Sequence, residues 1–173
     1  KYDVIIFDMI KGEVQPPYAL TKESFGEGLN MLKPGGLLLV NFQGHFDELE
    51  GLPFRSIVAT LKAAGFTNTE FHVENCEPGS PCDFIVIGSV DVPDISFDKN
   101  RINKCCLDEW FVKDLLSGDR VLENDVGKGE AIVFTDDLPI LEHINLKSIV
   151  EWRTNMIDNS TKKSLEEGVR LFK

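Results

Sequence analysis

The sequence lacks several features that mark common classes of protein. No apolar run approaches the ~20 residues that a membrane-spanning helix needs, and no signal peptide is visible. Basic residues are scarce, because 18 Lys and Arg stand against 29 Asp and Glu, for a formal net charge of −11. Phosphate groups would repel such a chain, which argues against nucleic acid as a partner. A cationic substrate fits this charge, and so does a solvated acidic surface.

Cysteine and histidine motifs are missing as well. The four cysteines at 76, 82, 105 and 106 form no Cys-x-x-Cys pair, so we expect no metal site. Free thiols in a reducing cytoplasm are the expected state, and a link between Cys76 and Cys82 across their turn is geometrically possible. The three histidines are scattered and no serine stands in a nucleophile-elbow motif, so we read these residues as structural or surface groups.

The first 44 residues organise the rest of the chain. Val4–Phe7 and Leu37–Val40 are apolar runs without polar alternation, which is typical of strands buried on both faces of a parallel sheet. A helix is predicted between them, from about Thr21 to Leu32, and the segment Lys-Pro-Gly-Gly ends it. Asp8 closes the first strand. In open α/β sheets, residues at the carboxyl ends of strands face the ligand crevice, so Asp8 is the first candidate for chemistry.

The start of the chain has no initiator Met and lies almost inside a predicted strand. We therefore expect a fragment of a longer protein. Without a neighbour on its other side, Val4–Phe7 would be an exposed apolar edge that invites pairing with another chain. We predict that the chain self-associates through this edge or covers it with its own tail.

The remaining elements suggest two parts, residues 1–92 and a mostly helical extension, 93–173. The expected elements are a helix at 54–64 with Gly65 as C-cap, a half-exposed strand at 69–74, a buried strand at 83–90, a helix at 98–116, an extended segment at 131–134, and helices at 146–158 and 162–172. The strong turn signal at 76–81 makes the two strands beside it an antiparallel hairpin that closes the sheet.

Several of these segments together resemble a known family. The segments YDVIIFD, PPYALTKESF, LKPGGLLLVNFQG and DFIVIGSV are similar to the second half of the class I S-adenosylmethionine-dependent methyltransferase fold. They are most similar to its spermidine synthase-like (polyamine aminopropyltransferase) branch, which also carries a Thr-Asp-Asp-x-x-x-x-Glu segment, here Thr135, Asp136, Asp137 and Glu142. The resemblance implies a three-layer αβα Rossmann-like fold, of which this chain supplies strands four, five, seven and six.

The resemblance also implies site residues. Asp8 matches the carboxylate that orients an amine and accepts its proton, although a strand-end Asp that caps backbone amides is the structural alternative. Lys11 stands where the family has a second acid, which Glu13 could replace. Tyr18 would line the substrate pocket or its rim. Asp136 and Asp137 would either form a metal or amine site, since paired acids attract cations, or cap the following turn and fix the carboxyl-terminal arm.

The implied co-substrate is S-adenosylmethionine or its decarboxylated form. The chain has no Gly-x-Gly-x-x-Gly turn, which would let a backbone approach the nucleotide, so we expect the nucleotide-binding residues in a missing first half and this fragment to be inactive alone. The leading function is therefore that of a spermidine synthase-like transferase acting on a polyamine in the cytoplasm. The alternatives are a methyltransferase with another substrate, which Lys11 favours, and a non-catalytic binding or assembly module.

Overall fold

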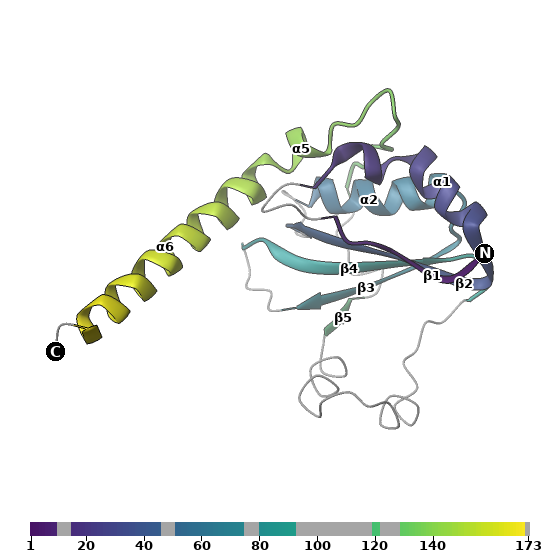
Figure 1. Cartoon of the computed structure of the whole chain (residues 1–173). Helices are drawn as coiled ribbons and strands as arrows, with labels where there is room; N and C mark the ends of the chain where they lie inside the picture. The colour runs from purple at the N-terminus through teal and green to yellow at the C-terminus, as the bar shows by residue number, and fades with distance from the viewer. Residues whose placement is uncertain (10–14, 46–50, 75–79, 93–118, 122–128, 172–173) are drawn as a thin grey trace, which may run out of the picture.

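A computed structural model describes residues 1–9, 15–45, 51–74, 80–92, 119–121 and 129–171. Its centre is a five-stranded sheet in the order β1-β2-β4-β3-β5 (Figure 1). The strands are β1 (Tyr2–Phe7), β2 (Leu32–Gly44), β3 (Asn68–Glu74), β4 (Cys82–Ser89) and β5 (Asp119–Val121). β1 and β2 are parallel, and each of the other neighbouring pairs is antiparallel. The first four strands thus have the order four, five, seven, six that the resemblance implies, and β3 and β4 pair as the expected hairpin.

Helix α1 (Lys22–Met31) connects the two parallel strands and begins where the sequence predicts. The Thr21 hydroxyl accepts a hydrogen bond from the Ser24 amide at 3.3 Å, so Thr21 is the N-cap. At the other end the chain passes straight into β2 at Leu32. The pairing with β1 then shifts register between Tyr2 and Val4, beside Gly35, whose φ of +73° suits a residue without a Cβ.

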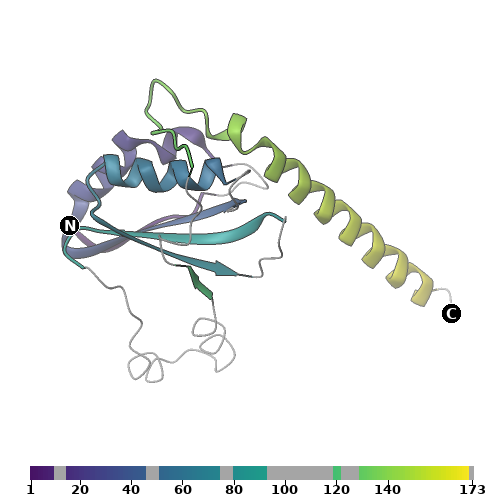
Figure 2. The ribbon, with the colours of Figure 1, turned by 180° about the vertical axis from the view of Figure 1, so that it is seen from behind.

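Helix α2 (Leu52–Ala63) follows β2 and lies on the same face of the sheet as α1 (Figures 1 and 2). Gly65 has a φ of +110°, and its amide and that of Phe66 bond the carbonyls of Lys62 and Leu61. This is the glycine C-cap that the sequence predicts.

The core fills the space between these helices and the sheet. Phe54 from α2 lies 4.9 Å from the Phe71 ring and 4.7 Å from the Phe84 ring, between ring centroids. Leu38 and Val40 of β2 point to the same side and are fully buried. Each buried side chain of this size contributes about 1.5–3 kcal/mol from apolar burial, so this face holds the domain together.

The opposite face of the sheet is the main departure from expectation. Val4 and Ile6 were predicted to be buried on both faces of a parallel sheet, yet they are 45% and 63% exposed. The reason is that β1 is the outer strand of the described sheet, and both described helices of this region cover the other face (Figure 2). The three-layer arrangement stays a prediction.

The carboxyl-terminal region begins with the expected extended segment, where Phe134 is fully buried. The helices α5 (Leu141–Ile144) and α6 (Leu146–Leu171) follow. Two helices were predicted here. The structure has the single helix α6, because nothing at 159–161 breaks it. α6 starts near β2, where Glu151 Oε2 lies 2.9 Å from His45 Nε2, and then extends away from the sheet (Figures 1 and 2).

Other predictions meet different outcomes. The helix expected at 98–116 lies outside the described residues, and the division at residue 92 stays a prediction. The strand expected to be half-exposed is present, but Phe71, Val73 and Glu70 in it are all buried. None of the described helices has the length and apolarity to cross a membrane.

The cysteine prediction is wrong for Cys82. This residue is disulfide-bonded, and its partner lies outside the described residues. Since disulfides persist mainly in oxidising compartments, the thiols no longer support a cytoplasmic location.

Candidate functional site

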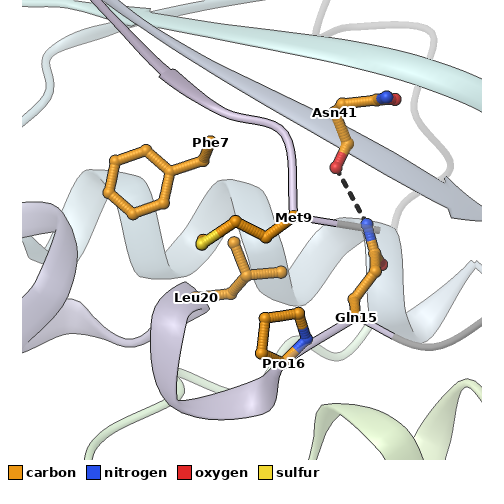
Figure 3. A pocket seen from close by; sticks show the side chains of 6 residues that line it. All are labelled: Phe7, Met9, Gln15, Pro16, Leu20 and Asn41. Carbon is orange, nitrogen blue, oxygen red and sulfur yellow. Dashed lines mark hydrogen bonds between the residues drawn. The ribbon is translucent and has the colours of Figure 1, made fainter. Parts of the chain in front are cut away.

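A small hollow lies at the carboxyl ends of β1 and β2. Its empty volume is about 160 Å³, part of which is open to solvent. The lining residues come from the end of β1, the following loop, helix η1 (Pro17–Leu20) and β2: Phe7, Met9, Gln15, Pro16, Leu20 and Asn41 (Figure 3). Four of these six side chains are apolar, so the hollow has apolar walls and a polar side.

Asp8 directly follows β1, between Phe7 and Met9, and is not itself among the residues that line the hollow. The strand register pairs Phe7 with Val40, which brings the next residues, Asp8 and Asn41, beside each other. The Asn41 side-chain amide donates a hydrogen bond to Asp8 Oδ1 at 3.0 Å. The carboxylate is exposed and is therefore both oriented by the sheet and accessible to a ligand.

Gln15 forms the polar side of the hollow together with Asn41. Its Nε2 donates to the main-chain oxygen of Asn41 at 2.8 Å, as Figure 3 shows. The side chain is buried, and its Oε1 has no hydrogen-bond partner in the described part of the chain. An unsatisfied buried acceptor costs about 1–3 kcal/mol, which makes Gln15 the most unusual group of this region.

The end of β1 explains why an amide side chain is needed here. β1 stops at Phe7, whereas β2 continues to Gly44, so the main chain of β2 loses its neighbouring strand after Val40. Side-chain amides then bond the carbonyls that β1 does not reach: Gln15 bonds that of Asn41, and Asn145 Nδ2 bonds that of Gln43 at 2.9 Å. Buried carbonyl groups need such partners.

Asp136 is joined to the start of α1. Its Oδ1 accepts a 2.7 Å hydrogen bond from the Thr21 hydroxyl, and its amide donates to Glu23 Oε2 at 3.0 Å. Next to it, the amide of Lys22 donates to the Phe134 carbonyl at 2.8 Å. Two parts of the sequence resemblance, more than a hundred residues apart, therefore meet at the helix that follows the hollow.

The other predicted site residues have different surroundings. Tyr18 belongs to η1 but is 66% exposed and does not line this hollow. Asp137 is exposed in the turn from Thr135 to Leu138. Glu13 and Lys11 lie outside the described residues, so the replacement of one acid by the other stays a prediction. No group of His, Cys, Asp and Glu in the described ranges could hold a metal ion.

Two polar residues of the site were not predicted. Asn41 follows the second buried strand at the same sheet end as Asp8, so the rule that found Asp8 could have found it. Gln15 has no comparable signal, since it is a single polar residue in a loop before two prolines. Asn41 contacts both other residues: its side-chain amide donates to Asp8, and its main-chain oxygen accepts from Gln15.

Comparisons with known proteins add a loose structural likeness. No protein-family model matches the chain, and no curated protein matches it. A crystal structure of a probable spermidine synthase from Corynebacterium glutamicum ATCC 13032 is similar to 75% of this chain, with 22% sequence identity and a TM-score of 0.45. The matched region is 48% of that protein, so this chain spans about half of its length.

Proposed function

We propose that the chain supplies the acceptor side of the active site in a spermidine synthase-like transferase. Such an enzyme moves an aminopropyl group from a sulfonium to the nitrogen of an amine. In the alternative, a methyltransferase, the group that moves is a methyl group. The single observation that carries the proposal is Asp8, an exposed carboxylate that Asn41 holds directly after the carboxyl end of β1. An exposed carboxylate in this place attracts an ammonium group.

The residues present fit the acceptor half of this reaction. The co-substrate supplies an electrophilic carbon next to a positively charged sulfur. Asp8 orients the amine nitrogen for attack on that carbon, the C–N bond forms as the C–S bond breaks, and the nitrogen's extra proton passes to the carboxylate or to water. For a transfer of this kind the protein contributes mainly position and a negative field near the cation.

Two further observations support the synthase-like branch. The strand order β1-β2-β4-β3 is the order that the resemblance implies, and Asp136 of the Thr-Asp-Asp segment bonds Thr21 at the start of α1. That bond attaches the turn at Thr135–Leu138 to the start of α1. We therefore propose that Asp136 positions α1 and does not contact the substrate. The nucleotide would be held mostly by residues outside this chain.

A non-catalytic assembly module is the second candidate, and the exposed apolar side chains of Val4 and Ile6 favour it. An outer strand with apolar groups on its free face is suited to binding another protein. In this case the fold would be retained for assembly, and Asp8 would only order the end of β1.

Calorimetric titration separates these candidates. The chain alone and the whole gene product that carries it are titrated with S-adenosylmethionine, decarboxylated S-adenosylmethionine and methylthioadenosine. Binding by the whole gene product supports a transferase, and preference for the decarboxylated form supports aminopropyl transfer. Binding of S-adenosylmethionine in preference supports the methyltransferase. Absence of binding to all three by both proteins would overturn the transferase and leave the assembly module.

A further inference from the structure

Segment 130–134 is bound to α1 and α2 through its main chain. The Ile132 amide donates to Ser56 Oγ at 3.0 Å, and the Phe134 amide donates to Thr60 Oγ1 at 2.9 Å. Two main-chain oxygens of the segment accept hydrogen bonds from the same helices. Arg55 Nε donates to the Glu130 oxygen at 3.1 Å, and the Lys22 amide donates to the Phe134 oxygen at 2.8 Å. We call the four residues of α1 and α2 that make these bonds the α1–α2 surface: Lys22, Arg55, Ser56 and Thr60.

The two hydroxyls of this surface are spaced to bind an extended chain. Ser56 and Thr60 lie four residues apart in α2, a rise of about 6.0 Å. Ile132 and Phe134 are two residues apart, a distance of about 6.6–6.8 Å in an extended chain. Each hydroxyl also donates within α2, Ser56 to the Leu52 oxygen and Thr60 to the Ser56 oxygen, both at 2.7 Å. Because a hydroxyl has a single proton, α2 itself holds both oxygens as acceptors.

Few side chains of the segment take part in its binding. Phe134 is fully buried and Ile132 packs against the core, whereas Ala131 and Val133 are exposed. Since the hydrogen bonds reach main-chain atoms, they require an extended chain with free amides but no particular sequence. Domains that bind extended peptides likewise combine main-chain hydrogen bonds with pockets for alternate side chains. The same combination is present here, with Phe134 as the anchor.

We propose that the α1–α2 surface is a peptide-binding site, occupied here by the chain's own segment, and that segment 130–134 of a second copy can occupy it instead. The second copy fits because it presents Ile132 and Phe134 with the spacing that the surface binds. The chain's own segment competes at an effective concentration in the millimolar range, so exchange requires its release. The inference goes beyond the proposed function, since no residue of the surface lines the hollow.

The test uses the full chain with Phe134→Ala, which removes the anchor of its own segment, and a synthetic peptide of residues 129–138 with blocked ends. Calorimetric titration should show saturable binding at a single site, at least about a hundredfold tighter than in the wild type. The reason is that truncation of a buried Phe weakens the competing segment by two or more powers of ten. No saturable binding to Phe134→Ala at about 1 mM peptide would overturn the inference.

Two pairs of modified peptides test how the segment is recognised. Methylation of the Phe134 nitrogen removes the N–H that Thr60 accepts and should weaken binding about tenfold. Methylation of the Val133 nitrogen, which makes none of the bonds to the surface, should weaken it less. In the second pair, Phe134→Ala in the peptide should abolish binding, whereas Val133→Ala should leave it unchanged. Equal effects within either pair would overturn the inference.

Should the chain with Phe134→Ala fail to fold, hydrogen exchange in the wild type decides. Peptide at roughly ten times the millimolar effective concentration of the chain's own segment should displace that segment. The amides of Ile132 and Phe134 should then exchange faster, and the peptide with Phe134→Ala should have no such effect. Unchanged exchange of both amides, or equal acceleration by the two peptides, would overturn the inference.

Discussion

The two faces of the sheet are built from the same strands and have opposite surroundings. On the face toward α1 and α2, Phe42, Phe71 and Phe84 are almost completely buried, whereas on the other face Val4, Ile6 and Ile85 are 45%, 63% and 41% exposed. Both sets are apolar, so composition does not distinguish them. The difference shows that apolar residues in a strand indicate a sheet but not what covers it, because coverage depends on elements elsewhere in the chain.

Removing one ring from the helix-covered face should have the largest effect. Phe84→Ala leaves a cavity beside Phe42 and Phe54, whose rings lie 6.1 and 4.7 Å away between centroids, and should cost about 3–5 kcal/mol of unfolding free energy. Ile85→Ala, one residue along on the exposed face, should cost about 1 kcal/mol or less. Urea unfolding of both variants measures the contrast, and equal costs would mean that the exposed face is covered in solution.

A charge on the outer strand should act on association instead of folding. We predict that the chain expressed alone self-associates through β1, and that Ile6→Lys weakens this association on the order of tenfold, since facing lysines repel at a paired edge. Ile85→Lys places the same charge on the same face but on an interior strand, and should change association less. Sedimentation velocity measures both. A strictly monomeric wild type with rapid amide exchange throughout β1 would contradict the prediction.

The packing of the extended segment 131–134 against α2 should depend on one hydroxyl group. Thr60 Oγ1 accepts a buried hydrogen bond from the Phe134 amide at 2.9 Å, and Thr60→Val leaves that amide without its partner, at a cost of about 1–3 kcal/mol. The control, Thr67→Val, loses an exposed 2.9 Å bond to Val90 and should change stability by less than about 0.5 kcal/mol. Thermal unfolding of the two variants compares them, and an equal loss would show that the arm is not docked.

The smallest effect concerns an exposed ion pair at the start of β1. Lys33 donates a hydrogen bond to Asp3 at 2.7 Å, and this bond and the lysine charge hold the Asp3 pKa below its usual 3.8. The pair therefore stabilises the fold above the unfolded-state pKa of Asp3, and the contribution disappears as the pH falls through the lowered folded-state pKa. Lys33→Gln should raise the pKa of Asp3, which an NMR titration of its side-chain carbons detects; an unchanged pKa would show that the pair does not form in solution.

Much of the fold was predictable because it depends on local signals. The cap at Thr21, the glycine at 65 and the apolar runs in β2 and β4 each indicate an element without knowledge of the rest. The exposure of Val4 and Ile6 was harder to predict, since it depends on what packs against β1. The continuity of α6 was not predicted, although an exposed helix tolerates polar residues on all sides, as at 159–161.

The residues of the candidate site also differ in how far the sequence predicts them. Asp8 was predictable from its place at the end of a buried strand, and Asn41 could have been found by the same rule. Gln15 could not, because its importance comes from where β1 ends relative to β2. Likewise, the bond between Thr21 and Asp136 joins residues that only the folded chain brings together.

The most direct test of the central claim compares two aspartates, Asp8 directly after β1 and Asp3 within it. Transfer from decarboxylated S-adenosylmethionine or S-adenosylmethionine to an amine is measured with the whole gene product and with its Asp8→Asn and Asp3→Asn variants. Asp8→Asn should lower kcat by at least about a hundredfold, because a positioned acid–base group contributes roughly 10²–10⁴ in rate. Asp3→Asn should keep the wild-type rate. An Asp8→Asn variant as active as the wild type would contradict the account.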